Sequence, residues 1–238
     1  MSPPVLDLSG VSKNYGGLRP LRIHQLTVAA GEHVALIGLD QPMAEVFINL
    51  VTGASLPEQG EVKVFGQSTA AIADSVEWLA LVDRFGIVTE RAVFLEALTL
   101  QQNLAVPLTL DIEPVPPEVA RRTAALAGEL DIPASQWDQA VGGLDAATRA
   151  RARIARALAL DPPVILLDHP SATLDRADVV PIGGRLRSVA TRRGAAIVAL
   201  TADQAFAAAI AGRVLTLDAA TGRLTGPRRS RWFGGRLG

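Results

Sequence analysis

The sequence contains no cysteine, which excludes disulfide bonds and zinc sites built on thiolates. No uninterrupted apolar run reaches the roughly 18 residues that a membrane-spanning helix requires. The opening residues, MSPPVLDLSG, lack the basic and apolar regions of a signal peptide. A formal net charge of −1 argues against a general nucleic-acid-binding protein. These absences predict a cytoplasmic protein that uses no redox chemistry and has no nucleic-acid partner.

Lysine is the other scarce residue, because only Lys13 and Lys63 occur in the whole chain. The scarcity bears on function, since loops that bind phosphate groups need a lysine at one fixed place. Arginine supplies the remaining positive charge, and from Arg223 to the C-terminus no acidic residue accompanies it.

The last residues form a distinct segment of the sequence. We predict that residues 227–238 are a basic, aromatic tail, in which Arg231, Trp232 and Phe233 contact a partner subunit or anionic lipid headgroups. A solvated, disordered terminus is the alternative interpretation.

Apolar segments of two kinds alternate along the chain. Short apolar runs bounded by turns predict strands at residues 5–8, 21–28, 33–37, 61–65, 85–88, 164–167, 196–201 and 213–217. Helical spacing predicts helices at residues 43–52, 118–130, 145–160, 176–193 and 204–211. This alternation predicts an α/β fold with a mostly parallel sheet, preceded by an antiparallel pair of strands. The sequence shows no internal repeat.

Several stretches resemble the ATP-binding cassette (ABC) transporter ATPase family almost letter for letter. They are, in order, VSKNYGG, LTVAAGEHVALIG, NLVTG, GEVKVFG, LTLQQNLAVPL, ARALALDPPVILLD and GRVLTLDAATGRL. Because they follow the family's order and spacing over about residues 5–226, the chain is identified as a member of that family.

The resemblance implies an α/β ABC-ATPase fold. Its parts are a mostly parallel P-loop-type core sheet, an N-terminal antiparallel β-subdomain and an inserted α-helical subdomain. We predict a discontinuous core at residues 1–92 and 161–226, with the helical subdomain at residues 93–160. The family also implies ATP and Mg²⁺, held between two subunits by the phosphate loop of one and the signature motif of the other, with hydrolysis driving a membrane permease.

The phosphate loop of this family has the pattern G-x-x-x-x-G-K-[ST], in which backbone N–H groups, a lysine and a hydroxyl hold the phosphates and Mg²⁺. Counting from Gly38 without a gap places Met43 at the second glycine, Ala44 at the lysine and Glu45 at the hydroxyl. Pro42 also removes one N–H group. The loop therefore lacks the groups that the motif uses to bind phosphate.

Two carboxylates accompany these losses, and negative charge near a helix N-terminus is stabilising. One interpretation places Asp40 or Glu45 in the anion site, where it takes the place of phosphate. The other is that Asp40 simply caps the following helix. Both interpretations exclude phosphate, and we predict no bound ATP or Mg²⁺ for this chain.

The family's signature motif, LSGGQ, donates N–H groups to the γ-phosphate of the nucleotide bound by the partner. Counting back from Asp161-Pro162 aligns it with Leu144, Asp145, Ala146, Ala147 and Thr148. Asp145 would direct an anion at the γ-phosphate, or it serves as a helix N-cap. An alternative alignment uses Val141-Gly142-Gly143 but requires an insertion before the helix.

The strand VILLD resembles the Walker B strand and retains Asp168, which holds Mg²⁺ in the family. The next residue, a glutamate in the family, is His169, for which we predict a structural polar role in preference to that of a general base. Asp175 matches the family's D-loop aspartate and is a candidate for a dimer interface.

Three further positions complete the comparison with the family. The glutamine after residues 85–88 is Glu90, and the switch histidine after residues 196–201 is Ala202. Tyr15 matches the aromatic residue that stacks on adenine, although one stacking contact cannot replace a phosphate site.

Both halves of the composite site are altered in one chain, which disfavours a half-active heterodimer. We predict a non-hydrolysing ABC subunit that is a structural or regulatory component of a membrane transport complex. Its partners would be a permease, another ABC subunit or both, in a homo- or heterodimer on the inner face of the membrane. FLEALTLQQNLAVPL resembles members that work with lipid- or lipoprotein-handling permeases.

Two alternatives stay open. The first is a soluble, non-catalytic homodimer that binds another protein. The second is a deviant ATPase that binds and hydrolyses ATP with an arginine such as Arg91 in place of the lysine.

Overall fold

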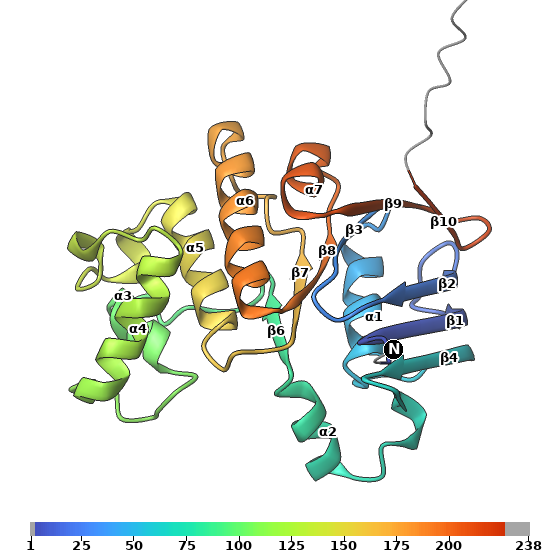
Figure 1. The fold of residues 1–238 in the computed structure, drawn as a ribbon, viewed down its shortest axis with the longest axis horizontal. Coiled ribbons are helices and arrows are strands. Elements are labelled where there is room, and N and C mark those ends of the chain that lie inside the picture. The colour runs from blue at the N-terminus through green and yellow to red at the C-terminus, as the bar shows by residue number, and fades with distance from the viewer. Residues whose placement is uncertain (1–2, 227–238) are drawn as a thin grey trace, which may run out of the picture.

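The computed structural model describes residues 3–226, which form two sheets flanked by helices (Figure 1). The larger sheet has the strand order β10-β9-β3-β8-β7-β6 and the smaller one the order β2-β1-β4-β5. The strands are β1 (Leu6–Lys13), β2 (Leu21–Val28), β3 (His33–Ile37), β4 (Gln59–Val64), β5 (Gln67–Ser68), β6 (Phe85–Val88), β7 (Val164–Asp168), β8 (Ala196–Leu200), β9 (Arg213–Asp218) and β10 (Arg223–Thr225). The helices are α1 (Gln41–Val51), α2 (Ser75–Val82), α3 (Leu100–Ala105), α4 (Pro117–Glu129), α5 (Ala146–Ala157), α6 (Arg176–Arg193) and α7 (Gln204–Ile210).

The larger sheet is parallel from β9 to β6, with β10 added antiparallel at its edge. The sequences VILLD of β7 and AIVAL of β8 are buried at every position. Continuous burial is expected for parallel strands that are covered on both faces. The apolar runs in the sequence therefore correspond to the centre of the molecule.

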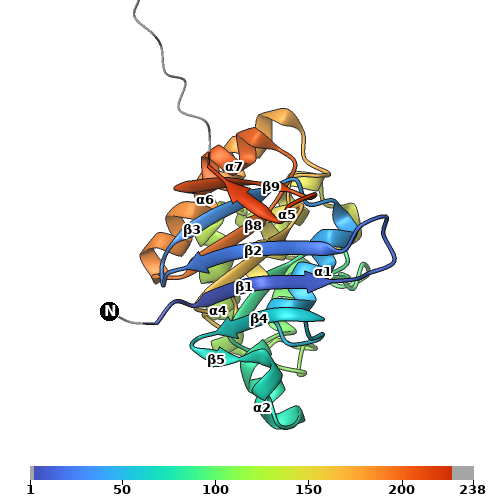
Figure 2. The ribbon, with the colours of Figure 1, turned by 90° about the vertical axis from the view of Figure 1, so that its right-hand side faces the viewer.

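The smaller sheet is antiparallel and crosses in front of α1 in the view of Figure 2. Its strand β2 alternates between buried and exposed side chains over most of its length, the pattern of a sheet with one covered face. Helix α1 lies between the sheets, since Phe47, Leu50 and Val51 share one buried cluster with residues of both. The position of α1 thus depends on the packing of two sheets.

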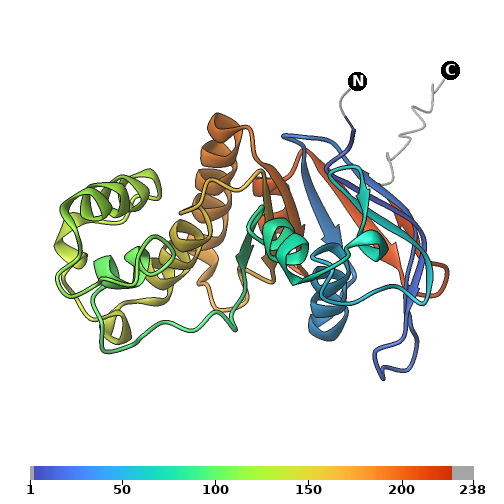
Figure 3. The same ribbon diagram turned by 90° about the horizontal axis from the view of Figure 1, so that it is seen from below.

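Helices α3, α4 and α5 lie together at the opposite end of the molecule, beyond α6 (Figure 3). Their buried residues belong to the same cluster as those of α6 and α7 and the second face of the parallel sheet. Ion pairs join α4 to α6, with Arg193 2.6 Å from Glu129 and Arg185 2.6 Å from Asp131. Within residues 3–226, no helix combines the length and the apolar character needed to cross a membrane.

The structure corrects several sequence predictions. The first helix begins at Gln41 and not at residue 43, because Asp40 caps it two residues earlier. Helix α2 was not predicted, since none of its side chains is buried and no one-sided apolar pattern marks it. The sequence does contain a signal for the start of this helix. Asp74 accepts from the N–H groups of Val76 and Glu77, and the Glu77 side chain accepts from the N–H of Ala73. Strands β5 and β10 are short and were also missed.

Candidate functional site

The carboxyl ends of the parallel strands form the candidate site. The loops after β3, β6, β7 and β8 meet at this edge, as expected for strands that run in one direction. They carry the phosphate loop, Glu90, His169 and Ala202 respectively. The structure therefore brings these predicted positions to one edge of the sheet.

The connection between β3 and α1 is only three residues long, from Gly38 to Asp40. Gly38 has a φ of +95°, and a Cβ there would lie 2.9 Å from the carbonyl oxygen of Leu217. Glycine is required at Gly38 for both reasons. Positions 41–43, which belong to the loop in the family motif, are the first turn of α1 in this chain.

Two N–H groups near the start of α1 are already engaged. The Asp40 carboxylate accepts from the N–H of Met43 at 2.9 Å, and the Asp40 carbonyl accepts from the N–H of Ala44 at 2.9 Å. Pro42 has no N–H to offer. The N–H of Met43 is one of the groups that a helix N-terminus can present to an anion, and here it is bound by the Asp40 carboxylate. The capping interpretation of Asp40 is confirmed.

The lysine and hydroxyl positions face in different directions. Ala44 is completely buried in the cluster between the two sheets. Glu45 is half-exposed and lies 2.5 Å from Arg91, which follows β6. The hydrogen bond with Arg91 lowers the pKa of Glu45, and the same bond raises the pKa of Arg91. Glu45 is thus paired with Arg91 and does not cap the helix.

Tyr15 lies at this edge of the molecule as well. Burial and then the charge of Asp40 raise the pKa of its hydroxyl. The ring folds over its own turn, so that a Cβ on Gly17 would lie 2.7 Å from the ring. The hydroxyl end of the Tyr15 ring therefore lies close to Gly17.

Asp168 ends β7 with a side chain that is only 4% exposed. Its Oδ2 accepts from the Thr89 hydroxyl at 3.3 Å, and its Oδ1 lies 2.9 Å from Nδ1 of His169. Nε2 of His169 lies 3.2 Å from the Leu39 carbonyl. His169 consequently joins the end of β7 to the phosphate loop.

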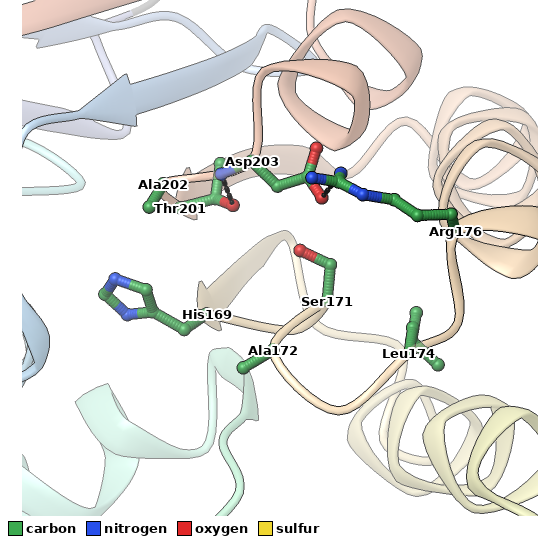
Figure 4. Close-up of a pocket in the computed structure, with 8 residues that line it drawn as sticks. All are labelled: His169, Ser171, Ala172, Leu174, Arg176, Thr201, Ala202 and Asp203. Carbon is green, nitrogen blue, oxygen red and sulfur yellow. Dashed lines mark hydrogen bonds and ion pairs between the residues drawn. The ribbon is translucent and has the colours of Figure 1, made fainter.

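A cavity of about 390 Å³ opens beside His169 (Figure 4). Its polar groups include Ser171, Arg176 and Asp203, none of which the sequence analysis selected. Arg176 lies 2.8 Å from Asp203, and the Asp203 N–H donates to the Thr201 hydroxyl. Ala202 is exposed on the wall formed by this loop. Asp203 was detectable in principle, as an aspartate one residue before a helix.

Glu90 occupies a bridging position. Its Oε1 accepts from Nη1 of Arg153 on α5 at 3.1 Å and from the Thr173 hydroxyl in the loop after β7 at 3.1 Å. Asp175 begins α6 as an exposed N-cap residue whose side chain makes no capping hydrogen bond. The D-loop position is therefore open at the surface of this chain.

The signature segment, Leu144 to Thr148, forms the start of α5. Asp145 accepts from the N–H of Thr148 at 2.7 Å and from its hydroxyl at 2.9 Å. The hydrogen bond from the Thr148 N–H is the main cause that lowers the pKa of Asp145. Ala146 and Ala147 are the first residues of the helix. The N-cap prediction for Asp145 is confirmed, while Val141–Gly143 of the alternative alignment forms a short 3₁₀ helix before it.

The residues at the phosphate edge do not fit ATP with Mg²⁺. The N–H of Met43 is engaged by the Asp40 carboxylate, no lysine or hydroxyl stands at positions 44 and 45, and both oxygens of Asp168 have protein partners. No group of three His, Cys, Asp or Glu side chains that would hold a metal occurs in residues 3–226. Arg231, Trp232 and Phe233 of the predicted tail lie outside the described residues.

A parallel α/β core with a strand–loop–helix at its carboxyl edge and an antiparallel sheet beside it defines a P-loop-type nucleotide-binding fold. The model of the ABC transporter family matches residues 21–172. The chain therefore belongs to the ABC transporter family.

Relatives of known identity include ATP-binding proteins of transport systems. The methionine import ATP-binding protein MetN of Brucella abortus is 28% identical over 91% of this chain, and the chain spans only 58% of MetN. The lipoprotein-releasing system ATP-binding protein LolD of Chromohalobacter salexigens is 30% identical over 84% of this chain and 83% of LolD. The macrolide export ATP-binding/permease protein MacB 1 of Aeromonas hydrophila is 31% identical over 87% of this chain and 32% of MacB 1.

Solved structures confirm the ABC-ATPase fold. The dimeric bacterial ABC transporter cassette MJ0796 superimposes with a TM-score of 0.73, at 23% identity over 89% of this chain and 94% of MJ0796. CbiO1 from Clostridium perfringens, part of the transporter complex CbiONQ, gives a TM-score of 0.78 at 21% identity over 94% of this chain and 87% of CbiO1. Sequence identities this low support only the assignment of the fold.

Proposed function

We propose that this chain is a non-hydrolysing ABC subunit that serves as a structural or regulatory component of a membrane transport complex. The observation that carries the proposal is the capping of α1 by Asp40, which places a carboxylate where a bound phosphate would lie. Under this proposal the chain has the fold of an ABC cassette but neither binds nor hydrolyses ATP.

The first support is the energy needed to admit a phosphate. An N-cap aspartate contributes about 1 kcal/mol to a helix. A phosphate would have to displace Asp40 from the N–H of Met43, and the carboxylate would remain as a neighbouring negative charge. No lysine is present to offset that repulsion, because Ala44 occupies its place in the buried core.

The second support comes from the groups that would act on the attacking water. His169 contacts Asp168 and the Leu39 carbonyl, so its ring is held between the strand end and the phosphate loop. Ala202 has no side-chain group to contact a γ-phosphate. No step of ATP hydrolysis follows from these residues.

Family membership supports the proposed partners. MetN, LolD and MacB are named for import, release and export, and MJ0796 is a dimeric cassette. We propose a permease and a second ABC subunit as partners, in a homo- or heterodimer, with this chain at the inner face of the membrane. The likeness to LolD favours a lipid- or lipoprotein-related complex.

Nucleotide titration tests the proposal. Isothermal titration calorimetry of the purified chain with ATP, with and without Mg²⁺, is expected to show no binding. The matched comparison is a variant with the family motif restored, carrying Asp40→Ser, Pro42→Ser, Met43→Gly, Ala44→Lys and Glu45→Ser, for which binding is expected. Micromolar binding of MgATP by the natural chain would contradict the proposal.

A second candidate function is a deviant ATPase that uses Arg91 as the phosphate-binding cation. Asp168 contributes to the electrostatic surroundings of Arg91, so this arginine does lie towards the site. Its guanidinium is committed to Glu45, however, at 2.5 Å. If Glu45→Gln frees Arg91 and produces MgATP hydrolysis above that of the natural chain, the arginine hypothesis gains support.

A soluble homodimer without a membrane partner is the remaining alternative. Affinity purification from detergent-solubilised membranes separates the two cases. Recovery of a multi-spanning permease with the tagged chain supports the transport complex, and recovery of the chain alone as a dimer supports the homodimer.

A further inference from the structure

The carboxylate of Glu90 joins three separate segments of the chain. Glu90 follows β6, and its Oε1 accepts from Arg153 on α5 and from Thr173 in the loop after β7, both at 3.1 Å. A carboxylate that accepts from a guanidinium makes a charge-assisted bond, which is stronger than a bond between neutral groups. One side chain therefore connects the parallel sheet to the group of helices α3, α4 and α5, here called the helical part.

The pair is shielded from solvent. The side chain of Arg153 is 12% exposed and that of Glu90 is 27% exposed. Nε of Arg153 is buried and has no hydrogen-bond partner among the described residues. The charge of Arg153 consequently depends on Glu90 for compensation, and removal of one partner from a pair this buried leaves an unfavourable isolated charge.

Neighbouring contacts extend the same attachment. Arg149 makes a bidentate pair with Glu96, at 2.6 and 3.0 Å, and Arg156 donates to the Val93 carbonyl at 2.9 Å. Together with Arg153 these residues lie on one face of α5, at intervals of four and three residues. The ring of Phe94, only 3% exposed, lies between 4.7 and 5.9 Å from the three guanidinium carbons. Residues 90–96 are thus bound along the face of α5.

The helical part has a second attachment at a different place. Arg193 and Arg185 of α6 pair with Glu129 and Asp131 at the end of α4. A second attachment at a separate place removes rotations that one attachment alone leaves free. The contact of Glu90 with Arg153 lies away from the α4–α6 attachment and is shielded from solvent, so it restricts rotation of the helical part about that attachment.

We propose that Glu90 is a permanent latch, which fixes the helical part against the core sheet in one orientation that MgATP does not change. The proposal deepens and rests on the proposed function, because a subunit that binds no nucleotide needs its orientation set from within. Glu90 acts here as a positioning residue that works through Arg153 and Thr173.

The absence of cysteine makes the test direct. Ser135→Cys, near the start of α5, and Ala208→Cys on α7 introduce two exposed sites for nitroxide spin labels. Double electron–electron resonance then measures the distance distribution between the helical part and the core in the full chain. In the natural background we expect one narrow distribution that is the same with and without MgATP.

Glu90→Gln removes the charge and keeps the size of the side chain, and we expect loss of the narrow distribution. The matched control is Glu96→Gln, which removes a bond of the same kind from Arg149 but leaves the three-segment junction intact, so its distribution should stay narrow. Thr173→Val keeps both charges and is expected to broaden the distribution to a smaller extent. Thr173→Val replaces Glu90→Gln as the test if circular dichroism shows that Glu90→Gln does not fold.

Two results would overturn the latch: a broad distribution in the natural background, or unchanged distributions in both Glu90→Gln and Thr173→Val. Failure of the proposed function is a separate result. ATP binding in calorimetry together with a narrow, MgATP-independent distribution would refute the proposed function and leave the latch, whereas absence of ATP binding with a broad distribution would do the reverse.

Discussion

The start of α1 and the contact between α4 and α6 are both built from acidic and basic side chains, with different results. At α1, Asp40 caps its own helix and Glu45 pairs with Arg91 on the surface, where both partners are more than 40% exposed. Between α4 and α6, Arg193 is 19% exposed and pairs with Glu129 and Asp161, each at 2.6 Å. Removing one partner of an exposed pair costs little, whereas removing one partner of a shielded pair leaves an uncompensated charge and costs much more. We therefore expect substitutions at α1 to affect stability less than substitutions between α4 and α6.

The largest effect is expected from Arg193→Ala. This substitution removes the donor to the Leu158 carbonyl and the 2.6 Å contacts of Glu129 and Asp161, which keep only longer contacts with Arg192 and Arg122, at 3.6 and 3.5 Å. We expect the free energy of unfolding to fall by about 2–3 kcal/mol, somewhat less than for a fully buried pair. Urea denaturation measures it, and Arg192→Ala is the control, because Arg192 is 53% exposed and 3.6 Å from Glu129. Equal losses in the two variants would remove the distinction between shielded and exposed pairs.

At the other region, Asp40→Ala is expected to lower the free energy of unfolding by about 1 kcal/mol, the usual value of an N-cap. Asp40→Ser should restore most of that loss, since its hydroxyl can accept from the same N–H. Chemical denaturation of the three proteins checks this. A loss of unfolding free energy as large as that of Arg193→Ala would show that the start of α1 contributes as much to stability as the contact between α4 and α6.

A third prediction concerns the amino end of β3, the strand whose carboxyl end leads to Asp40. His33 is buried, and this burial lowers its pKa below the ordinary value, with Nε2 lying 3.2 Å from the Ala195 carbonyl. Below pH of about 6.5 the unfolded chain gains a proton that the folded chain does not, so stability falls as the pH falls. For one such group the loss between pH 6.5 and 5.5 is at most about 1 kcal/mol.

The measurement for His33 is urea denaturation as a function of pH. His33→Gln should remove this part of the pH dependence, while the exposed His24 offers a control in His24→Gln. If both variants keep the slope of the natural chain, other groups cause it.

The smallest effect is expected from Glu45→Gln, which removes the exposed pair with Arg91. Its free energy of unfolding should change by less than about 0.5 kcal/mol, as for most surface pairs. Thermal denaturation at low and high salt measures it. A substantial, salt-dependent loss would mean that the surface charges at α1 stabilise the fold after all.

The elements of the core were predictable because their signals are local. The strand His33–Ile37 and the helix Arg176–Arg193 have the boundaries that apolar periodicity and turn residues indicate. The capping role of Asp145 was likewise contained in the residues next to it. Helix α2 was missed because packing leaves its apolar side chains outside the core.

The candidate site depended on contacts between distant residues. The sequence left open what Asp40 and Glu45 contact, and the structure shows Asp40 as the helix cap and Glu45 paired with Arg91, which lies far along the chain. The contact of His169 with Leu39 and that of Glu90 with Arg153 also join residues that are far apart in the sequence. The division of the chain into core and helical subdomains at residues 92 and 160 stays a prediction.

The early start of α1 has an evolutionary consequence under the proposed function. Any single reversion towards the phosphate-binding motif at Asp40, Pro42, Met43, Ala44 or Glu45 leaves the other changes in place. Replacing Met43, Ala44 or Glu45 alone leaves the Asp40 cap in place, so a single step back brings no phosphate binding. The altered loop is therefore expected to be hard to reverse. A lineage that carries it is expected to change at the surfaces that contact its binding partners and not to regain ATPase activity.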